Sequence, residues 1–223
     1  IFVSISGFGP DGPYADQPVY DLVVQGMSGA MPIQGGSGPP QMIRSVIADK
    51  SAAITAASSA LAALLARERN GGEGQHVHVP MVNAYAQIAL PAMMTLQAFG
   101  PPGDEIPAAP DIFHVWSCAD GYLVGMSIED KQFTGLCKAL ELDSLATDER
   151  FNSLGARLAN TAAMIAIIDA ELGKRPWRDA LATLQKHDVP FAPVYDLQDF
   201  MEDSQVKHNG TIFEAEDPRG GTT

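Results

Sequence analysis

A long alanine-rich stretch, residues 51–69, constrains the fold of this chain more than any other feature. Its apolar residues recur at the spacing of an α-helix. The stretch ends at Asn70-Gly71-Gly72, and glycine after asparagine is a common left-handed helix stop. The sequence therefore predicts one long helix whose small side chains suit close packing against neighbouring elements.

A single carboxylate, Asp49, stands directly before this stretch. Val46 and Ile47 are predicted to end a buried strand or an extended entry segment, which places Asp49 at or near the N-cap of the helix. Aspartate is among the preferred capping residues, so the local pattern favours a simple cap. The alternative is a nucleophile, because the helix dipole and free backbone amides can keep a partly buried carboxylate ionised.

The composition is that of a soluble protein. The chain has 223 residues, 46% of them hydrophobic, which is enough for one large domain or two small ones. No apolar run approaches the roughly 18 to 20 residues that span a membrane. Residues 1–5 do not resemble a signal peptide, and Cys118 and Cys137 give no disulfide framework. We expect a cytoplasmic protein without a membrane partner, preceded by a segment that is absent before Ile1.

The net charge of −13 disfavours nucleic acid as a partner, since phosphate contacts need clustered lysine and arginine. A small anionic ligand stays compatible with this charge. His76 and His78 share one face of a predicted strand over residues 74–80, but no third metal ligand is apparent nearby. We therefore expect edge-strand histidines and no bound metal.

The N-terminal half alternates predicted strands and helices. Residues 1–5 are predicted to form a buried strand, followed by a loop rich in glycine and proline. Residues 20–31 have helical spacing, and residues 81–99 are predicted to form a helix that is broken or kinked near Pro91. A loop at the carboxyl end of a strand is where α/β proteins place ligands, although this loop carries no phosphate-binding fingerprint.

Residues 100–110, with four prolines and two glycines, form the clearest boundary in the chain. Beyond it the sequence predicts a hairpin turn at Ala119-Asp120-Gly121. Helices are expected over residues 127–142, 158–172 and 177–187, and a final strand over residues 189–194. This order predicts a small α+β domain.

Three blocks in this order resemble one family. They are SGFGPDGPY with its continuation to residue 29, IADK at the start of the long helix with its continuation to residue 75, and CADGY followed by residues 150–160. Together the blocks resemble the class III CoA-transferases, the family of formyl-CoA transferase, carnitine CoA-transferase and the α-methylacyl-CoA racemases. The resemblance covers nearly the whole chain.

The resemblance implies an α/β fold and a layout of domains. Residues 1–99 would be part of a large, Rossmann-like, CoA-binding domain, and residues 100–110 a linker. Residues 111–205 would form the small α+β domain, and residues 206–223 the start of a return to the large domain. Because family members are longer and form interlocked dimers, we expect a central fragment of a homodimeric enzyme.

In this family an aspartate at the start of the corresponding helix is the nucleophile, and it maps onto Asp49. With the resemblance, the nucleophile becomes the favoured interpretation over the cap. The resemblance implies that Asp49 attacks an acyl-CoA thioester, giving a mixed anhydride and then an aspartyl-CoA thioester. A small carboxylic acid would finally take over the CoA, and no metal is needed.

The resemblance also implies that CoA binds along the loop after the first predicted strand. The expected contacts are Ala15, Asp16, Gln17, Pro18 and Tyr20. Arg44 could reach a phosphate or a substrate carboxylate, or it could be a solvated surface residue.

Two departures from the family matter. The racemase branch uses a histidine where this chain has Tyr20, and a tyrosine with a pKa of about 10 is a poor general base, so racemisation is disfavoured. The glycine-rich loop that closes over the nucleophile in some transferases corresponds to residues 103–110, which are rich in proline and alanine. The sequence does not identify the acceptor acid. The alternatives are an acyl-CoA racemase and a non-catalytic CoA-binding subunit in which Asp49 is only a cap.

Overall fold

The computed structural model describes residues 1–36, 38–94, 112–213, 215 and 219–220. The chain divides into two compact units, Ile1–Ala109 and Pro110–Thr223. The expected linker, residues 100–110, and the loop expected over residues 103–110 lie outside the described residues.

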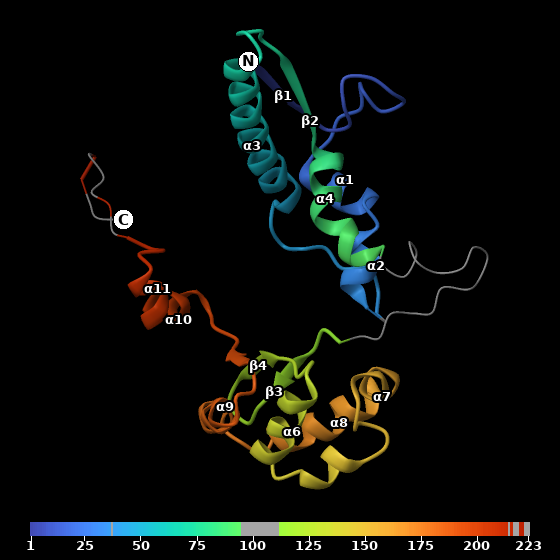
Figure 1. The fold of residues 1–223 in the computed structure, drawn as a ribbon, viewed down its shortest axis with the longest axis vertical. Coiled ribbons are helices and arrows are strands. Elements are labelled where there is room, and N and C mark those ends of the chain that lie inside the picture. The colour runs from blue at the N-terminus through green and yellow to red at the C-terminus, as the bar shows by residue number, and fades with distance from the viewer. Residues whose placement is uncertain (37, 95–111, 214, 216–218, 221–223) are drawn as a thin grey trace, which may run out of the picture. The chain divides into compact units, whose positions relative to one another are not determined.

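The first unit is a pair of parallel strands flanked by helices (Figure 1). Its elements are β1 (Phe2–Ser6), α1 (Asp21–Met27), α2 (Ala30–Gly35), α3 (Ile47–Arg69), β2 (His76–Pro80) and α4 (Met81–Met93). The register pairs Phe2 with His76 and Ser6 with Pro80. The long helix α3 contacts both strands as well as α1 and α4. The parallel pair and its helical crossover confirm the predicted α/β character.

The long helix ends as predicted and begins differently. Gly71 and Gly72, just past its C-cap, have φ angles of 85° and 89°, which suit glycine because it has no Cβ. At the other end, Ile47 already belongs to the helix and Val46 is its N-cap. The strand predicted to end there is therefore wrong, because the polar side chains of α1 hold this segment at the start of the helix.

The small core of the first unit lies between its helices and β2. It consists of Val24, Ala48, Ala52, Val79, Met81, Ala84 and Tyr85. Phe2 and Ile5 of β1 are exposed, so the prediction of a buried strand is wrong for this chain. Among the described residues β1 has one strand neighbour, β2; its Val3 packs against the core, whereas Phe2 and Ile5 are left uncovered. In α4, Pro91 lies inside the helix, and the predicted continuation over residues 95–99 lies outside the described residues.

The second unit is a three-stranded antiparallel sheet covered by helices. Its elements are β3 (Val115–Ser117), β4 (Tyr122–Gly125), α6 (Asp130–Ala139), η1 (Asp143–Thr147), α7 (Leu154–Ala159), α8 (Thr161–Leu172), α9 (Trp177–Lys186) and β5 (Phe191–Pro193). The strand order is β3-β4-β5. The predicted hairpin is confirmed, and the Cys118 amide donates to the Gly121 carbonyl across its turn at 2.8 Å.

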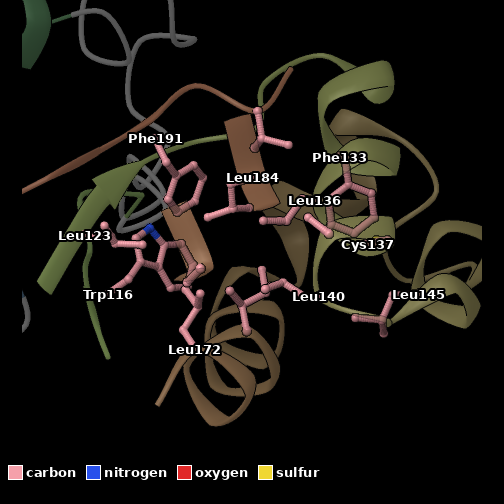
Figure 2. Close-up of a cluster of buried hydrophobic side chains, with 14 of the residues drawn as sticks. Trp116, Leu123, Phe133, Leu136, Cys137, Leu140, Leu145, Leu172, Leu184 and Phe191 are labelled. Atoms are coloured by element: carbon pink, nitrogen blue, oxygen red, sulfur yellow. The ribbon is translucent and has the colours of Figure 1, made fainter. Parts of the chain in front are cut away.

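Large apolar side chains from the sheet and the helices interdigitate to form the core of the second unit (Figure 2). Phe133 and Leu136 of α6, and Leu140 at the C-cap of that helix, meet Leu172 of α8 and Leu184 of α9 there. Each is buried, and a buried leucine or phenylalanine contributes about 1.5–3 kcal/mol of hydrophobic free energy. This core holds the second unit together without any contribution from the first.

Two features of the second unit differ from the prediction. The amphipathic segment expected over residues 158–172 is two helices, because the Asn160 side chain donates to the Ala156 carbonyl and ends α7. Near the C-terminus, α10 (Leu197–Glu202) and α11 (Ser204–His208) were not predicted; Asp196 and Asp203 cap them. Within the described part of the chain, no helix combines the length and the apolar character that crossing a membrane requires.

Candidate functional site at the start of helix α3

Asp49 is the third residue of α3, on the first turn of the helix. Its side chain is exposed, and within the described part of the chain its carboxylate accepts no hydrogen bond. The expectation that Asp49 is partly buried and points at the free amides of the helix is therefore wrong. The cap is supplied by another residue.

Asp21, the first residue of α1, caps α3 from across the unit. Its Oδ2 accepts the backbone N–H of Ala48 at 2.7 Å and that of Asp49 at 3.0 Å. The first amides of a helix have no partner within the helix, so a buried helix start needs such an acceptor. Asp21 is only 4% exposed, which makes this a cap formed by tertiary structure.

Gln25 extends the same network toward the chain that enters α3. Its Nε2 donates to Asp21 Oδ1 at 2.6 Å and to the Ser45 carbonyl at 3.0 Å. Its Oε1 accepts the Ile43 backbone N–H at 3.0 Å. Gln25 is 1% exposed. One turn of α1, through the Asp21–Gln25 pair, thus fixes both the entry segment and the first turn that carries Asp49.

Tyr85 of α4 belongs to the buried cluster of this unit and lies near Asp21. Burial raises the pKa of the Tyr85 phenol, and the nearby negative charge of Asp21 raises it further. Tyr85 is therefore a neutral phenol at physiological pH. Helices α1, α3 and α4 all contribute residues to the buried cluster and hydrogen bonds next to the turn that carries Asp49.

Two of the residues expected to bind CoA are sequence neighbours of residues in this network. Tyr20 directly precedes Asp21 and is 80% exposed. Arg44 is exposed and lies between Ile43 and Ser45, the two residues that Gln25 binds through their backbone. The Asp21–Gln25 pair therefore binds the backbone next to Arg44 and at Asp49, and Tyr20 directly precedes it in the chain.

The other expected CoA residues occupy the loop between β1 and α1. Ala15 is half-buried, whereas Asp16, Gln17 and Pro18 are exposed. Turns shape this loop, with the Gln17 amide donating to the Tyr14 carbonyl at 3.0 Å. The loop projects from the strand pair on the side away from α3 (Figure 1). Among the described residues no hydrogen bond joins residues 15–18 to Asp49.

The root of this loop is tightly packed. A Cβ on Gly7 would lie 2.0 Å from Val19 Cγ1, so only glycine fits there. The Gly7 carbonyl also accepts the Val82 backbone N–H at 3.1 Å, which ties the loop to α4. The loop is therefore fixed at the carboxyl end of β1, whose role as a ligand position the sequence suggested.

The two histidines of β2 bind a hydroxyl of the neighbouring strand. Ser4 Oγ lies 2.9 Å from His76 Nε2 and 3.1 Å from His78 Nδ1. Within the described ranges no three histidine, cysteine or acidic side chains are grouped as a metal site requires.

The second unit contains a largely apolar cavity of about 240 Å³, lined by residues that include Met126, Leu154 and Met164. Arg157 also lines it and is buried; its guanidinium donates to the Phe151 and Ile128 carbonyls and lies over the Phe133 ring. None of the residues expected to bind CoA or to react lies in this cavity.

The sequence led to the prediction that Asp49 is the reactive residue, but the Asp21–Gln25 pair was not recognised as a structural unit. Asp21 and Gln25 are four residues apart, so they lie on one face of a helix, in a segment that is otherwise apolar. Two polar residues on the buried face of a short helix indicate a partner elsewhere in the chain. The sequence does not show that the partner is the start of α3.

Comparisons with known proteins agree on one family. The family model described as CoA-transferase family III matches residues 1–223. A succinate–glutarate CoA-transferase of Agrobacterium fabrum is 35% identical over 97% of this chain and 56% of its own length. An acetyl-CoA:oxalate CoA-transferase of Acetobacter aceti is 34% identical over 88% of this chain and 52% of its own length.

Solved structures give the same result for the fold. A CaiB/BaiF family protein from Brucella suis is 33% identical and superposes with a TM-score of 0.79, covering all of this chain and 59% of its own. Rv3272 of Mycobacterium tuberculosis, 24% identical with a TM-score of 0.82, shares the fold. The chain spans a little over half the length of these proteins.

Proposed function

Because this chain belongs to CoA-transferase family III, we propose that the whole enzyme moves CoA from an acyl-CoA to a small carboxylic acid, with Asp49 as the nucleophile. The observation that carries the assignment of Asp49 is its exposed carboxylate, which accepts no backbone hydrogen bond from the described residues and lies on a helix turn that the Asp21–Gln25 pair fixes. A carboxylate nucleophile needs both a fixed position and freedom to attack.

The proposed reaction passes through three covalent forms of Asp49: an anhydride with the donor acid, a CoA thioester and an anhydride with the acceptor acid. The Asp49 carboxylate attacks the thioester carbonyl, which forms a mixed anhydride and releases the CoA thiolate. The thiolate attacks the Asp49 carbonyl, so the donor acid leaves with one oxygen of Asp49 and an aspartyl-CoA thioester remains. The acceptor carboxylate then attacks this thioester, and the thiolate attacks the acceptor carbonyl. Asp49 is regenerated with one oxygen from the acceptor.

Tyr20 and Arg44 are proposed to contact the substrates. The permanent positive charge of Arg44, five residues before Asp49 in the segment that enters α3, suits a phosphate of CoA or the second carboxylate of an acceptor. Residues Ala15, Asp16, Gln17 and Pro18 are proposed to contact CoA further from the reacting atoms. Their place in the loop after β1 supports this role. CoA acts as a substrate, and the proposed chemistry needs no metal.

The acceptor is proposed to be a dicarboxylic acid. The relatives are named for glutarate, oxalate and mesaconate, which are all dicarboxylic acids. A second carboxylate would need a positive partner near Asp49, and Arg44 is exposed five residues before it in the chain.

The whole enzyme is proposed to be a cytoplasmic, interlocked homodimer with the domain layout expected from the resemblance. Apolar side chains left uncovered on α3 and β1 support a further partner surface in the first unit; among them are Ile54, Leu61 and Phe2, each at least 65% exposed. Light scattering of the full-length enzyme tests the dimer.

The function is tested with the full-length enzyme, succinyl-CoA or acetyl-CoA as donor, and a panel of carboxylic acids. We expect acceptor-CoA to form with the wild type and with Glu73→Gln, an exposed carboxylate beyond the end of α3, and not with Asp49→Asn. CoA binding without transfer to any acid would favour a non-catalytic subunit. Exchange of the donor's α-proton with solvent, without an acceptor, would indicate a racemase instead.

A further inference from the structure

We propose that Asp21 is a positioning residue for the reaction: by occupying the amides at the start of α3, it leaves the Asp49 carboxylate free to attack. This inference rests on the proposed function, since it concerns the reactivity of the proposed nucleophile. It assigns a role to a buried residue that touches neither CoA nor the acids.

The start of α3 offers amide donors that compete for any nearby carboxylate. Helix amides at the first turn have no partner within the helix and carry the positive end of the dipole. Asp49 lies on this same turn, and its side chain is exposed. A carboxylate that accepts backbone hydrogen bonds is stabilised as an anion and is a weaker nucleophile.

Asp21 removes this competition by taking two of the donors itself. One oxygen, Oδ2, accepts from both Ala48 and Asp49, and the bonds of 2.7 and 3.0 Å are short enough to be fully formed. Because Asp21 is buried, water does not readily replace it. The amide of Asp49 is thus bound on the inner side of the turn while its carboxylate lies in solvent on the outer side.

Gln25 keeps Asp21 in this orientation. The Gln25 amide nitrogen binds the other oxygen, Oδ1, while Gln25 itself is held by backbone groups of Ile43 and Ser45. Rotation of the Asp21 carboxylate would break this bond at 2.6 Å as well as those to α3. The network therefore has one arrangement that satisfies each of these groups.

Among the side chains that the structure describes, Asp21 is the one that accepts hydrogen bonds from these amides. On α3, Lys50 donates to Ser45 Oγ at 2.8 Å. On α4, Tyr85 faces Asp21 as a neutral phenol, and on β2 the two histidines bind Ser4. Arg44 and Tyr20 are exposed.

The test compares Asp21→Ala with Asp21→Asn in the full-length enzyme. The alanine frees both amides of α3, whereas the Oδ1 of an asparagine can take the place of Oδ2 and keep both of these bonds, at the cost of the bond from Gln25, because the asparagine Nδ2 cannot accept it. We measure kcat for transfer from succinyl-CoA, the dissociation constant of CoA by calorimetry, and the CD spectrum. Where Asp21→Ala does not give folded enzyme, Asp21→Ser is measured in its place, since its shorter side chain also fails to reach α3.

We expect Asp21→Ala to lower kcat by at least about tenfold while CoA binds as in the wild type, because a freed helix end draws the nucleophile out of position. Asp21→Asn should recover most of the loss. A merely structural role would lower kcat and CoA affinity together, or lower both variants equally, and either result would overturn the inference. Wild-type kcat in Asp21→Ala would overturn it too. A wild-type enzyme without transfer activity would instead refute the proposed function.

Discussion

Replacing Asp21 should damage the start of α3 far more than replacing Asp49, the residue that the local sequence marks as the cap. In Asp21→Ala, the amides of Ala48 and Asp49 and the Nε2 of Gln25 lose an acceptor at 2.6–3.0 Å. Loss of a cap costs about 0.5–2 kcal/mol, and each buried donor left unsatisfied costs about 1–3 kcal/mol. Since Asp49 is exposed, water can satisfy its freed amide in part, whereas Ala48 and Gln25 are buried, and we therefore expect a total of about 3 kcal/mol.

Asp49→Ala is the matched comparison. The Asp49 side chain is exposed and accepts no hydrogen bond within the described residues, so only its favourable interaction with the helix dipole is lost. That interaction is worth about 0.3–1 kcal/mol. The two variants therefore differ in cost by about 2 kcal/mol or more.

Hydrogen exchange followed by mass spectrometry measures this difference locally. Peptides that cover the first turns of α3 should exchange about a hundredfold faster in Asp21→Ala, which corresponds to about 3 kcal/mol, and close to the wild-type rate in Asp49→Ala. Peptides from α6, in the other unit, serve as the internal control. Equal protection of α3 in both variants, or greater loss in Asp49→Ala, would refute the assignment of the cap to Asp21.

Two further predictions concern the second unit, whose Trp116 and Trp177 report its unfolding by fluorescence. Gly135→Ala should lower the free energy of unfolding of this unit by about 1–3 kcal/mol, because the new Cβ would lie 2.5 Å from the His187 carbonyl oxygen. The control is Gly155→Ala, which has open space around it and should cost nothing measurable in urea titrations. Burial, reinforced by the negative charge of Asp143, raises the pKa of the Cys137 thiol from 9.0 to about 11. The unfolded unit therefore loses this proton first, so the free energy of unfolding should fall as pH rises from about 9 to about 11. A Cys137→Ala variant should lose this contribution to the pH dependence. An unchanged pH slope in Cys137→Ala would contradict the second prediction, and equal effects of the two glycine substitutions would contradict the first.

The sequence was informative where structure is local. The alanine-rich helix with its stop at Gly71 and Gly72, and the hairpin at Asp120-Gly121, each depend on residues close together in the chain, and the structure confirms them. The break at Asn160 was missed, because an asparagine inside an apolar pattern does not show whether its side chain will bind the helix backbone.

The site could be predicted only in part, for a physical reason. A helix start and an acidic residue are visible at Asp49, and the order of motifs marked that residue as the nucleophile. The true cap, Asp21, is 28 positions away in the chain and acts through tertiary structure. No local preference reveals such a partner. The sequence therefore suggested a partly buried Asp49, whereas its side chain is exposed in the structure.

Oxygen tracing tests the central claim, that Asp49 carries the transferred group, most directly. The full-length enzyme is incubated with succinyl-CoA and glutarate labelled with ¹⁸O in its carboxylates, and the peptide that contains Asp49 is then weighed by mass spectrometry. The proposed steps return one acceptor oxygen to Asp49, so this peptide should gain the mass of heavy oxygen while the corresponding peptide with Glu73 does not. Formation of glutaryl-CoA with an unlabelled Asp49 would contradict the account.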